Sequence, residues 1–341
     1  MFAYRIVPGQ NIQSLTREEV ARRKPKGHEV CLRVRAVSLN YRDLMVARGS
    51  YSLASGQPVI PCSDAAGEVI AIGPDVTRFR VGDRVVTSFF PSWIDGEVTS
   101  EKSVGALGGS ADGVLAEEVV LHENALAHFP EHLNFAQAST LSCAGVTAWN
   151  MLFEAAALKP GETVLLLGTG GVSIWALQLA KAAGLRTIIT SSSDEKLQRA
   201  RALGADEVVN YRTTPEWHEE VLRLTRGRGV GLVAELGGRD TLARSIAATS
   251  ATGTIALVGG VSGFTSELDV ISVIGGAKQL AGIYVGSRAM LEDLARFVGA
   301  AQLTPVIDRI FDFADAQQAY LHLESGKHFG KVVIEMTTQR A

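Results

Sequence analysis

The chain has 341 residues, 46% of them hydrophobic and 20% charged, and its formal net charge is −3. This length predicts two domains, and the composition is that of a soluble globular protein. The small negative charge argues against a nucleic-acid surface, and no apolar run approaches the ~20 residues of a membrane span. The N-terminus lacks the apolar core of a signal peptide, and three scattered cysteines are too few for a disulfide framework, so we expect a cytoplasmic protein.

The first third of the chain has the pattern of a β-rich domain. Polar and apolar residues alternate over 29–37, which predicts a half-buried strand. Shorter strands bounded by glycines and turn residues are predicted at 67–73 and 83–86, with another at 116–121. Between them, residues 91–113 are rich in Gly, Ser and Asp and predict a long surface loop.

From about Leu141 onward, predicted strands and helices alternate. The strands are expected at 164–167, 187–190, 207–210, 232–235 and 254–258, with helices between them, notably at 173–183 and 194–203. A further helix at 291–301 and a terminal strand at 330–334 follow. This alternation predicts a parallel sheet with helices on both faces.

The first of these strands leads directly into the turn Gly168-Thr169-Gly170-Gly171-Val172-Ser173, and a helix-forming run without Gly or Pro follows. In a dinucleotide-binding turn, Gly168 would allow the tight bend and Gly170 the close approach of a pyrophosphate. The sixth position is serine, so the glycine pattern is loose, and a glycine-rich turn of another kind is the alternative. The strand before and the helix after the turn favour the nucleotide site. We therefore predict that residues Gly168, Thr169, Gly170, Gly171 and Val172 bind a cofactor.

Seven segments along the chain match a known family in order and spacing. They are 38–43 (SLNYRD), 64–69 (DAAGEV), 81–85 (VGDRV), 143–149 (CAGVTAW), 168–173 (GTGGVS), 203–206 (LGAD) and 328–333 (HFGKVV). Together they resemble the medium-chain dehydrogenase/reductase superfamily, in particular its zinc-independent, quinone-oxidoreductase-like branch. The resemblance covers nearly the whole chain.

The resemblance implies an α/β protein with two domains. A GroES-like, β-rich catalytic domain would comprise 1–143 and 288–341, and a Rossmann domain with a doubly wound parallel sheet would comprise 144–287. The active site of such proteins lies in the cleft between the two domains. Relatives are commonly homo-oligomers, so a dimer is expected, and the apolar stretch 268–283 is either its interface or an interior helix and strand.

Zinc-dependent relatives carry a catalytic Cys, a His-Glu pair and a second Cys. The resemblance puts Asn40 at the first cysteine position and Asp64-Ala65 at the His-Glu pair, so that Cys143 alone remains. Catalytic zinc needs three protein ligands, and we therefore expect no metal site. We expect surface positions for His122, His128 and His132, whose spacing matches no metal motif. Cys143 is interpreted as a buried small hydrophobe, with a reactive thiol near the nicotinamide as the alternative.

The second strand of the Rossmann domain ends in Ser191-Ser192-Ser193-Asp194. NAD-selective sites have a carboxylate at this strand end, and the resemblance puts Ser191 at that position. Hydroxyl groups can donate to a 2′-phosphate, and Lys196 can add a charge-assisted contact. We therefore predict NADPH, with NADH as a weaker alternative because of Asp194. The serines can also cap the following helix, and the two roles are compatible. Further cofactor-binding positions expected from the resemblance are Thr147, Ser192, Tyr211, Gly259, Gly260 and Lys331.

Without zinc, no Lewis acid lowers the pKa of an alcohol, so alcohol oxidation is harder to explain. Reduction of an activated double bond needs a hydride donor, hydrogen bonds to a carbonyl oxygen and a proton source. Asn40, Tyr41 and Tyr51 are the candidate catalytic residues, and ordinary packing is an equal interpretation for the two tyrosines. The sequence thus predicts an NADPH-dependent reductase of quinones or α,β-unsaturated carbonyls. The alternatives are an alcohol dehydrogenase or aldehyde reductase of the same superfamily, and a non-catalytic NADPH-binding protein.

Overall fold

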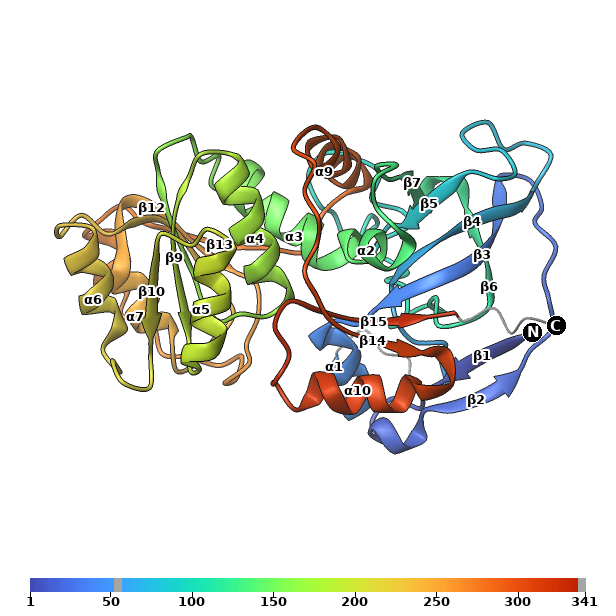
Figure 1. The fold of residues 1–341 in the computed structure, drawn as a ribbon, viewed down its shortest axis with the longest axis horizontal. Coiled ribbons are helices and arrows are strands. Elements are labelled where there is room, and N and C mark those ends of the chain that lie inside the picture. Colours follow the sequence, from blue (N-terminus) through green and yellow to red (C-terminus); the bar gives the residue numbers. More distant parts are fainter. Residues whose placement is uncertain (52–56, 337–341) are drawn as a thin grey trace. The chain divides into compact units, whose positions relative to one another are not determined.

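The computed structural model describes residues 1–51 and 57–336, which form two compact units (Figure 1). Unit 1 comprises Met1–Val146 together with the chain from Val285 onward, and unit 2 comprises Thr147–Tyr284. The domain limits expected from the resemblance, 144 and 287, each lie three residues from the limits of unit 2.

Unit 1 is built on a seven-stranded sheet. Its strands run in the order β14 (Ile307–Asp312), β15 (Lys331–Glu335), β3 (Glu29–Ser38), β4 (Asp64–Ile72), β5 (Arg84–Thr87) and β7 (Leu126–His128), and β6 (Glu118–His122) also pairs with β3. A separate antiparallel pair is formed by β1 (Phe2–Arg5) and β2 (Thr16–Glu19). The helices of this unit are α1 (Tyr41–Arg48), α2 (Phe135–Ser139), α9 (Arg288–Ala300) and α10 (Ala316–Glu324). The strands expected in the first third of the chain are confirmed.

The loop predicted at 91–113 forms neither helix nor strand, as expected, apart from an isolated bridge between Leu107 and Ala111. The prediction that it lies on the surface is wrong in part, because Trp93 and Ala106 are buried in a small aromatic core with Phe89 and Phe90. The aromatic side chains offset the polar composition of the loop by removing apolar area from water.

Unit 2 is a doubly wound α/β fold. Its six parallel strands run in the order β10 (Glu207–Asn210), β9 (Arg186–Ser191), β8 (Thr163–Leu166), β11 (Val230–Glu235), β12 (Thr249–Leu257) and β13 (Gln279–Gly282). The helices α4 (Gly171–Ala182), α5 (Asp194–Ala202), α6 (Trp217–Leu224), α7 (Leu242–Ala248) and α8 (Val270–Ile274) connect or follow these strands. The strand order reverses between β8 and β11, and ligands bind at such a switch point in open α/β sheets. The predicted fold class is confirmed.

Within the part of the chain that the structure describes, no helix is long and apolar enough to cross a membrane.

Candidate active site

The turn between β8 and α4 has the geometry that a pyrophosphate requires. Gly168 lies in the left-handed region with φ 75°, and a Cβ atom there would have no atom within 4 Å. Gly170 is the N-cap of α4, and no side chain caps the first N–H groups of that helix. These N–H groups and the positive end of the helix dipole form an anion site. The turn therefore fits the cofactor that the sequence predicts for it.

Ser173 explains the departure from the usual glycine pattern. Its side chain is fully buried, and its hydroxyl donates a hydrogen bond to the Leu167 carbonyl at 2.8 Å. The N–H of Gly168 in turn donates to the Thr190 hydroxyl at 3.2 Å. The serine thus ties the start of α4 back to the end of β8, so the helix packs closely without glycine or alanine at this position.

A cavity of about 420 Å³ lies within unit 2 at the carboxyl ends of its strands. Two of the predicted cofactor positions, Gly168 and Tyr211, line it. It is also lined by residues that the sequence analysis missed, including Trp217, Leu236, Gly237, Thr241 and Arg244. For Leu236 and Gly237 the signal was the Gly237-Gly238 pair, one residue after the end of β11 at the switch point of the sheet.

Glu235 holds the loop that follows β11 in place. The carboxylate is fully buried and accepts hydrogen bonds from the N–H groups of Gly237 (2.7 Å) and Gly238 (2.8 Å) and from the Thr241 hydroxyl (2.6 Å). It also bonds the Ser245 hydroxyl. Because the carboxylate satisfies four donors, this wall of the cavity is pre-organised.

The serine run after β9 includes a helix cap. The Ser193 hydroxyl accepts a hydrogen bond from the N–H of Lys196 at 3.3 Å, which confirms the capping interpretation for this residue. Ser191 is buried, and its oxygen accepts the N–H of Ser193 at 3.3 Å, which leaves its O–H able to donate. Tyr211, a residue that is 42% exposed, donates its N–H to the Ser191 carbonyl at 3.1 Å. At the strand end where NAD-selective sites have a carboxylate, this chain therefore has the hydroxyl side chain of Ser191.

The remaining predicted cofactor positions of unit 2 are on different elements. Thr147 is buried in α3 (Val146–Trp149), and Ser192 lies between β9 and α5. Gly259 and Gly260 follow β12, and the N–H of Gly259 donates to the carbonyl of Glu235 at 3.3 Å. This contact ties the turn after β12 to the end of β11.

In unit 1, strand pairing brings together three polar residues that are distant in sequence, namely Asn40, Asp64 and Lys331. Ser38, at the end of β3, pairs with Val333 of β15 on one side and with Asp64 of β4 on the other. Lys331, the first residue of β15, and Asn40, two residues beyond the end of β3, therefore meet, with Lys331 Nζ 2.5 Å from Asn40 Oδ1. The sequence analysis had placed Lys331 among the cofactor-binding residues without foreseeing this contact.

Asn40 is also the N-cap of helix α1. Its N–H donates to Asp43 Oδ2 at 2.8 Å, and this bond satisfies one of the N–H groups at the start of the helix. Asn40 is nine-tenths buried, and its Nδ2 atom makes no hydrogen bond of ordinary length among the described residues, although the Asn40 side chain acts as a donor to the Asp64 carboxyl and lowers its pKa. Nδ2 carries two N–H groups, so one of them remains able to donate to a ligand.

The surroundings of Asn40 hold two carboxylates and two cations. Burial raises the pKa of Asp43 and of Asp64, while Lys331 lowers both and Arg42 lowers that of Asp43. The Arg42 guanidinium lies 3.5 Å from Asp43 and stacks 4.7 Å from the centre of the Phe89 ring. Buried ion pairs of this kind add little to stability. Removing one of the charged side chains, however, would leave its partner buried and unpaired, which would disturb the local geometry.

Both candidate tyrosines belong to unit 1. Tyr41 is the first residue of α1 and is 40% exposed. The Tyr51 ring packs against the main core of the unit, with the Arg42 guanidinium 5.5 Å from its centre. Gly109 lies so close that a Cβ atom there would be 2.8 Å from the ring, which explains why glycine suits that position.

The side chains at the zinc-ligand positions do not fit a zinc ion. Asn40 offers an amide oxygen that already accepts from the Lys331 ammonium, and a second cation at this place would be repelled. Burial and the nearby Asp64 raise the pKa of the Cys143 thiol far above its usual range, which favours an unreactive thiol over the reactive alternative. Cys143 is only partly buried, rather than fully buried as the sequence analysis expected. In residues 1–51 and 57–336, no group of three or more His, Cys, Asp or Glu could hold a metal ion.

The three histidines that the sequence analysis considered are exposed, as predicted. His122 ends β6, His128 ends β7, and His132 lies in the loop that follows. The His122 ring accepts a hydrogen bond from the N–H of Asn124, so it has a structural role at the end of its strand.

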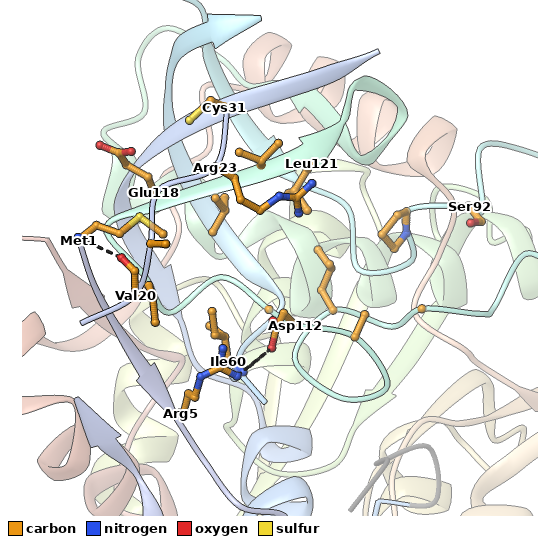
Figure 2. Close-up of a pocket in the computed structure, with 18 of the residues that line it drawn as sticks. Met1, Arg5, Val20, Arg23, Cys31, Ile60, Ser92, Asp112, Glu118 and Leu121 are labelled. Atoms are coloured by element: carbon orange, nitrogen blue, oxygen red, sulfur yellow. Dashed lines mark hydrogen bonds and ion pairs between the residues drawn. The ribbon is translucent and has the colours of Figure 1, made fainter. Parts of the chain in front are cut away.

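A larger cavity of about 530 Å³ lies elsewhere in unit 1 and contains none of the predicted site residues (Figure 2). Its walls are mainly apolar, and its charged groups are paired: Arg5 lies 3.7 Å from Asp112, and Arg23 bonds Glu29 at 2.8 Å. Asp112 also accepts the N–H of Ile60 at 2.9 Å. Because these charges are already paired, the cavity does not indicate the chemistry of a ligand.

Comparisons with known proteins agree with this architecture. The family model described as "Alcohol dehydrogenase GroES-like domain" matches residues 26–131, and that described as "Zinc-binding dehydrogenase" matches residues 171–300. A zinc-type alcohol dehydrogenase-like protein of Schizosaccharomyces pombe is 43% identical and covers 90% of this chain and 91% of its own length. A quinone oxidoreductase of Pseudomonas aeruginosa is 32% identical and covers 91% of this chain and 92% of its own.

Solved structures show the same similarity over the full length. A putative alcohol dehydrogenase from Sinorhizobium meliloti superposes with a TM-score of 0.91 at 41% identity, covering 98% of this chain and 99% of that chain. An NAD-dependent alcohol dehydrogenase superposes with a TM-score of 0.90 at 34% identity, covering 99% of this chain and 100% of that chain.

Proposed function

Because this chain belongs to the medium-chain dehydrogenase/reductase superfamily and is therefore an oxidoreductase, we propose that it reduces quinones or α,β-unsaturated carbonyls with NADPH and without a metal ion. The observation that carries the proposal is the donor set of Asn40, Asp64 and Cys143. The Asn40 amide has two N–H donors on Nδ2, of which at most one faces Asp64, so it can donate to a carbonyl oxygen, whereas its Oδ1 atom already accepts from Lys331 and does not suit zinc. The reaction therefore has to rely on hydrogen bonding rather than on a Lewis acid.

When bound, NADPH supplies the hydride. In the proposed reaction, Asn40 Nδ2 donates a hydrogen bond to the substrate oxygen, which gains negative charge as the hydride reaches the electrophilic carbon. A proton must then be delivered, to the neighbouring carbon of an enone or to the oxygens of a quinone. The hydroxyls of Tyr41 and Tyr51 are the proposed sources, directly or through water.

A nicotinamide cofactor follows from the family, and the choice of NADPH is part of the proposal. Gly168–Val172 would hold the pyrophosphate, and Thr147, Gly259 and Gly260 would lie at the nicotinamide. Ser191, Ser192, Lys196 and Tyr211 would contact the 2′-phosphate. The support is the absence of a carboxylate at the end of β9, together with the O–H of Ser191, which can donate.

We also propose a cytoplasmic homodimer. The stretch 268–283 forms α8 and the edge strand β13, and Val270, Ile271 and Ile274 are each more than half exposed. An exposed apolar patch beside a free strand edge is typical of an interface.

The first experiment compares NADPH and NADH oxidation with a panel of enones, quinones and one simple aldehyde. Turnover of enones or quinones with NADPH is expected. Turnover of the aldehyde alone would instead support an alcohol dehydrogenase, the activity named for several relatives. Tight NADPH binding with no turnover on any electrophile would indicate a non-catalytic protein.

The role of Asn40 is tested separately with Asn40→Ala. Removal of a single donor to a developing oxyanion lowers kcat by about 10²-fold in known enzymes, so a loss of this order is expected with NADPH affinity unchanged. A variant with wild-type kcat would remove Asn40 from the mechanism.

A further inference from the structure

Lys331 is a buried lysine whose contacts are unusual for a strand residue. It is the first residue of β15 and is 3% exposed. Its Nζ atom donates to the Leu39 carbonyl at 2.6 Å and to Asn40 Oδ1 at 2.5 Å. Burying an ammonium group is costly unless hydrogen bonds compensate, so these two bonds hold the side chain in one place.

The contact determines which atom of the Asn40 amide faces Lys331. An ammonium group carries three donors and no acceptor, and an amide offers one oxygen acceptor and one NH₂ donor. The atom that faces Lys331 can therefore only be Oδ1, because the reversed amide would place N–H groups against a cation. Nδ2 must then occupy the other position, on the side of the Asp64 carboxyl, where it makes no hydrogen bond of ordinary length among the described residues.

The other bonds of Asn40 restrict it further. Its N–H donates to Asp43 Oδ2 at 2.8 Å, which fixes the main chain at this residue. Its side chain also lowers the pKa of the neighbouring Asp64 carboxyl through a hydrogen bond, which only Nδ2 can donate, and the second N–H of Nδ2 is left for a ligand. A cation on Oδ1 polarises the amide and strengthens its N–H groups as donors.

We propose that Lys331 is a positioning residue for the reaction: it fixes the Asn40 amide so that Nδ2 is the group that donates to the substrate oxygen. This inference rests on the proposed function, in which Asn40 makes that contact. Lys331 thereby provides the positive charge of a site that does not suit a metal ion, and it acts through Asn40 rather than on the substrate.

A double-mutant cycle tests the proposal in the full chain, with NADPH and an enone that the wild type reduces. The variants are Lys331→Met, Asn40→Ala and the double variant. We expect Lys331→Met to lower kcat at least about tenfold with little change in the Kd of NADPH, because the amide can then turn. In the Asn40→Ala background, the same substitution should change kcat by less than about twofold, since no amide is left to orient.

Three further variants control the cycle. Lys331→Gln is uncharged and one atom shorter, and its amide can face either atom of the Asn40 amide, so it no longer selects Oδ1. It should therefore lose activity as Lys331→Met does, and it replaces that variant if Lys331→Met fails to fold. Lys331→Arg keeps a donor-only cation and should recover at least part of kcat. Lys181→Met removes a lysine that bonds Asp206 at 2.8 Å in unit 2, and kcat should stay unchanged.

The outcomes separate the two claims. If Asn40→Ala lowers kcat but Lys331→Met and Lys331→Gln retain it, the proposed function stands and the role of Lys331 is refuted. If the losses from Lys331→Met and Asn40→Ala multiply in the double variant, Lys331 acts independently of Asn40 and the inference is also refuted. If Asn40→Ala itself keeps wild-type kcat, the proposed role of Asn40 is wrong.

Discussion

Two glycines of unit 2 allow the effect of backbone strain to be separated from the effect of ligand contact. Gly168 in the β8–α4 turn has φ 75°, and Gly161 just before β8 has φ 89°. A Cβ atom would have no atom within 4 Å at either position. Alanine should therefore strain the backbone at both sites without creating a clash in the free protein, at a cost of about 1–2 kcal/mol each.

This cost should appear in both variants as a similar loss of thermal stability. For a unit of this size, about 1 kcal/mol lowers Tm by about 2–4 °C, so we expect Gly168→Ala and Gly161→Ala to unfold about 2–8 °C below the wild type. Scanning calorimetry of both proteins without cofactor measures this shift.

The two variants should differ in NADPH binding. The new methyl group at Gly168 would lie in the turn where the pyrophosphate has to approach the backbone, whereas that at Gly161 would not. We expect Gly168→Ala to raise the Kd of NADPH at least about tenfold, which corresponds to ~1.4 kcal/mol, and Gly161→Ala to leave it unchanged. Nicotinamide fluorescence during titration measures both constants.

The reasoning is refuted if Gly168→Ala binds NADPH as tightly as Gly161→Ala, because the pyrophosphate would then not approach this turn. If both variants lose affinity equally, the loss arises from the weakened unit rather than from a blocked contact.

Three further predictions follow from the described contacts. Ser191→Asp should lower the ratio of kcat/KM for NADPH to that for NADH at least about tenfold, because a carboxylate repels the 2′-phosphate; an unchanged ratio would contradict the cofactor assignment. Burial favours a higher pKa for Asp206, but hydrogen bonds from Lys181 and Thr187 outweigh it and hold the pKa below its ordinary 3.8. Asp206→Asn should therefore lower the free energy of unfolding, measured with urea at pH 7, by about 1 kcal/mol. The difference in this free energy between wild type and variant should narrow as the pH falls below 3.8 and through the folded pKa of Asp206. A difference that stays constant with pH would contradict this. Prolonged incubation with a zinc chelator should leave kcat unchanged, and a loss restored by zinc would show that the donor set has been misinterpreted.

Most of the fold could be predicted because its signals are local. The apolar strand, the turn from Gly168 and the helix-forming run after it determine their own geometry, since glycine permits φ 75° and the helix begins where N–H groups are uncapped. The prediction was less accurate where the geometry is irregular. Strand β12 begins at Thr249 rather than at 254, because left-handed Thr252 (φ 60°) and a register shift opposite Val230–Leu232 interrupt its pattern.

The sequence by itself determined the alternating architecture and the glycine turn, because each depends on residue types and short spacings, whereas the zinc-ligand positions were located by the resemblance to the family. Only the tertiary structure decided that Lys331 meets Asn40 across 291 positions of the chain. That meeting depends on the antiparallel register of β15 against β3, which no local pattern specifies, since a shift of one residue would turn Lys331 to the opposite face of the sheet.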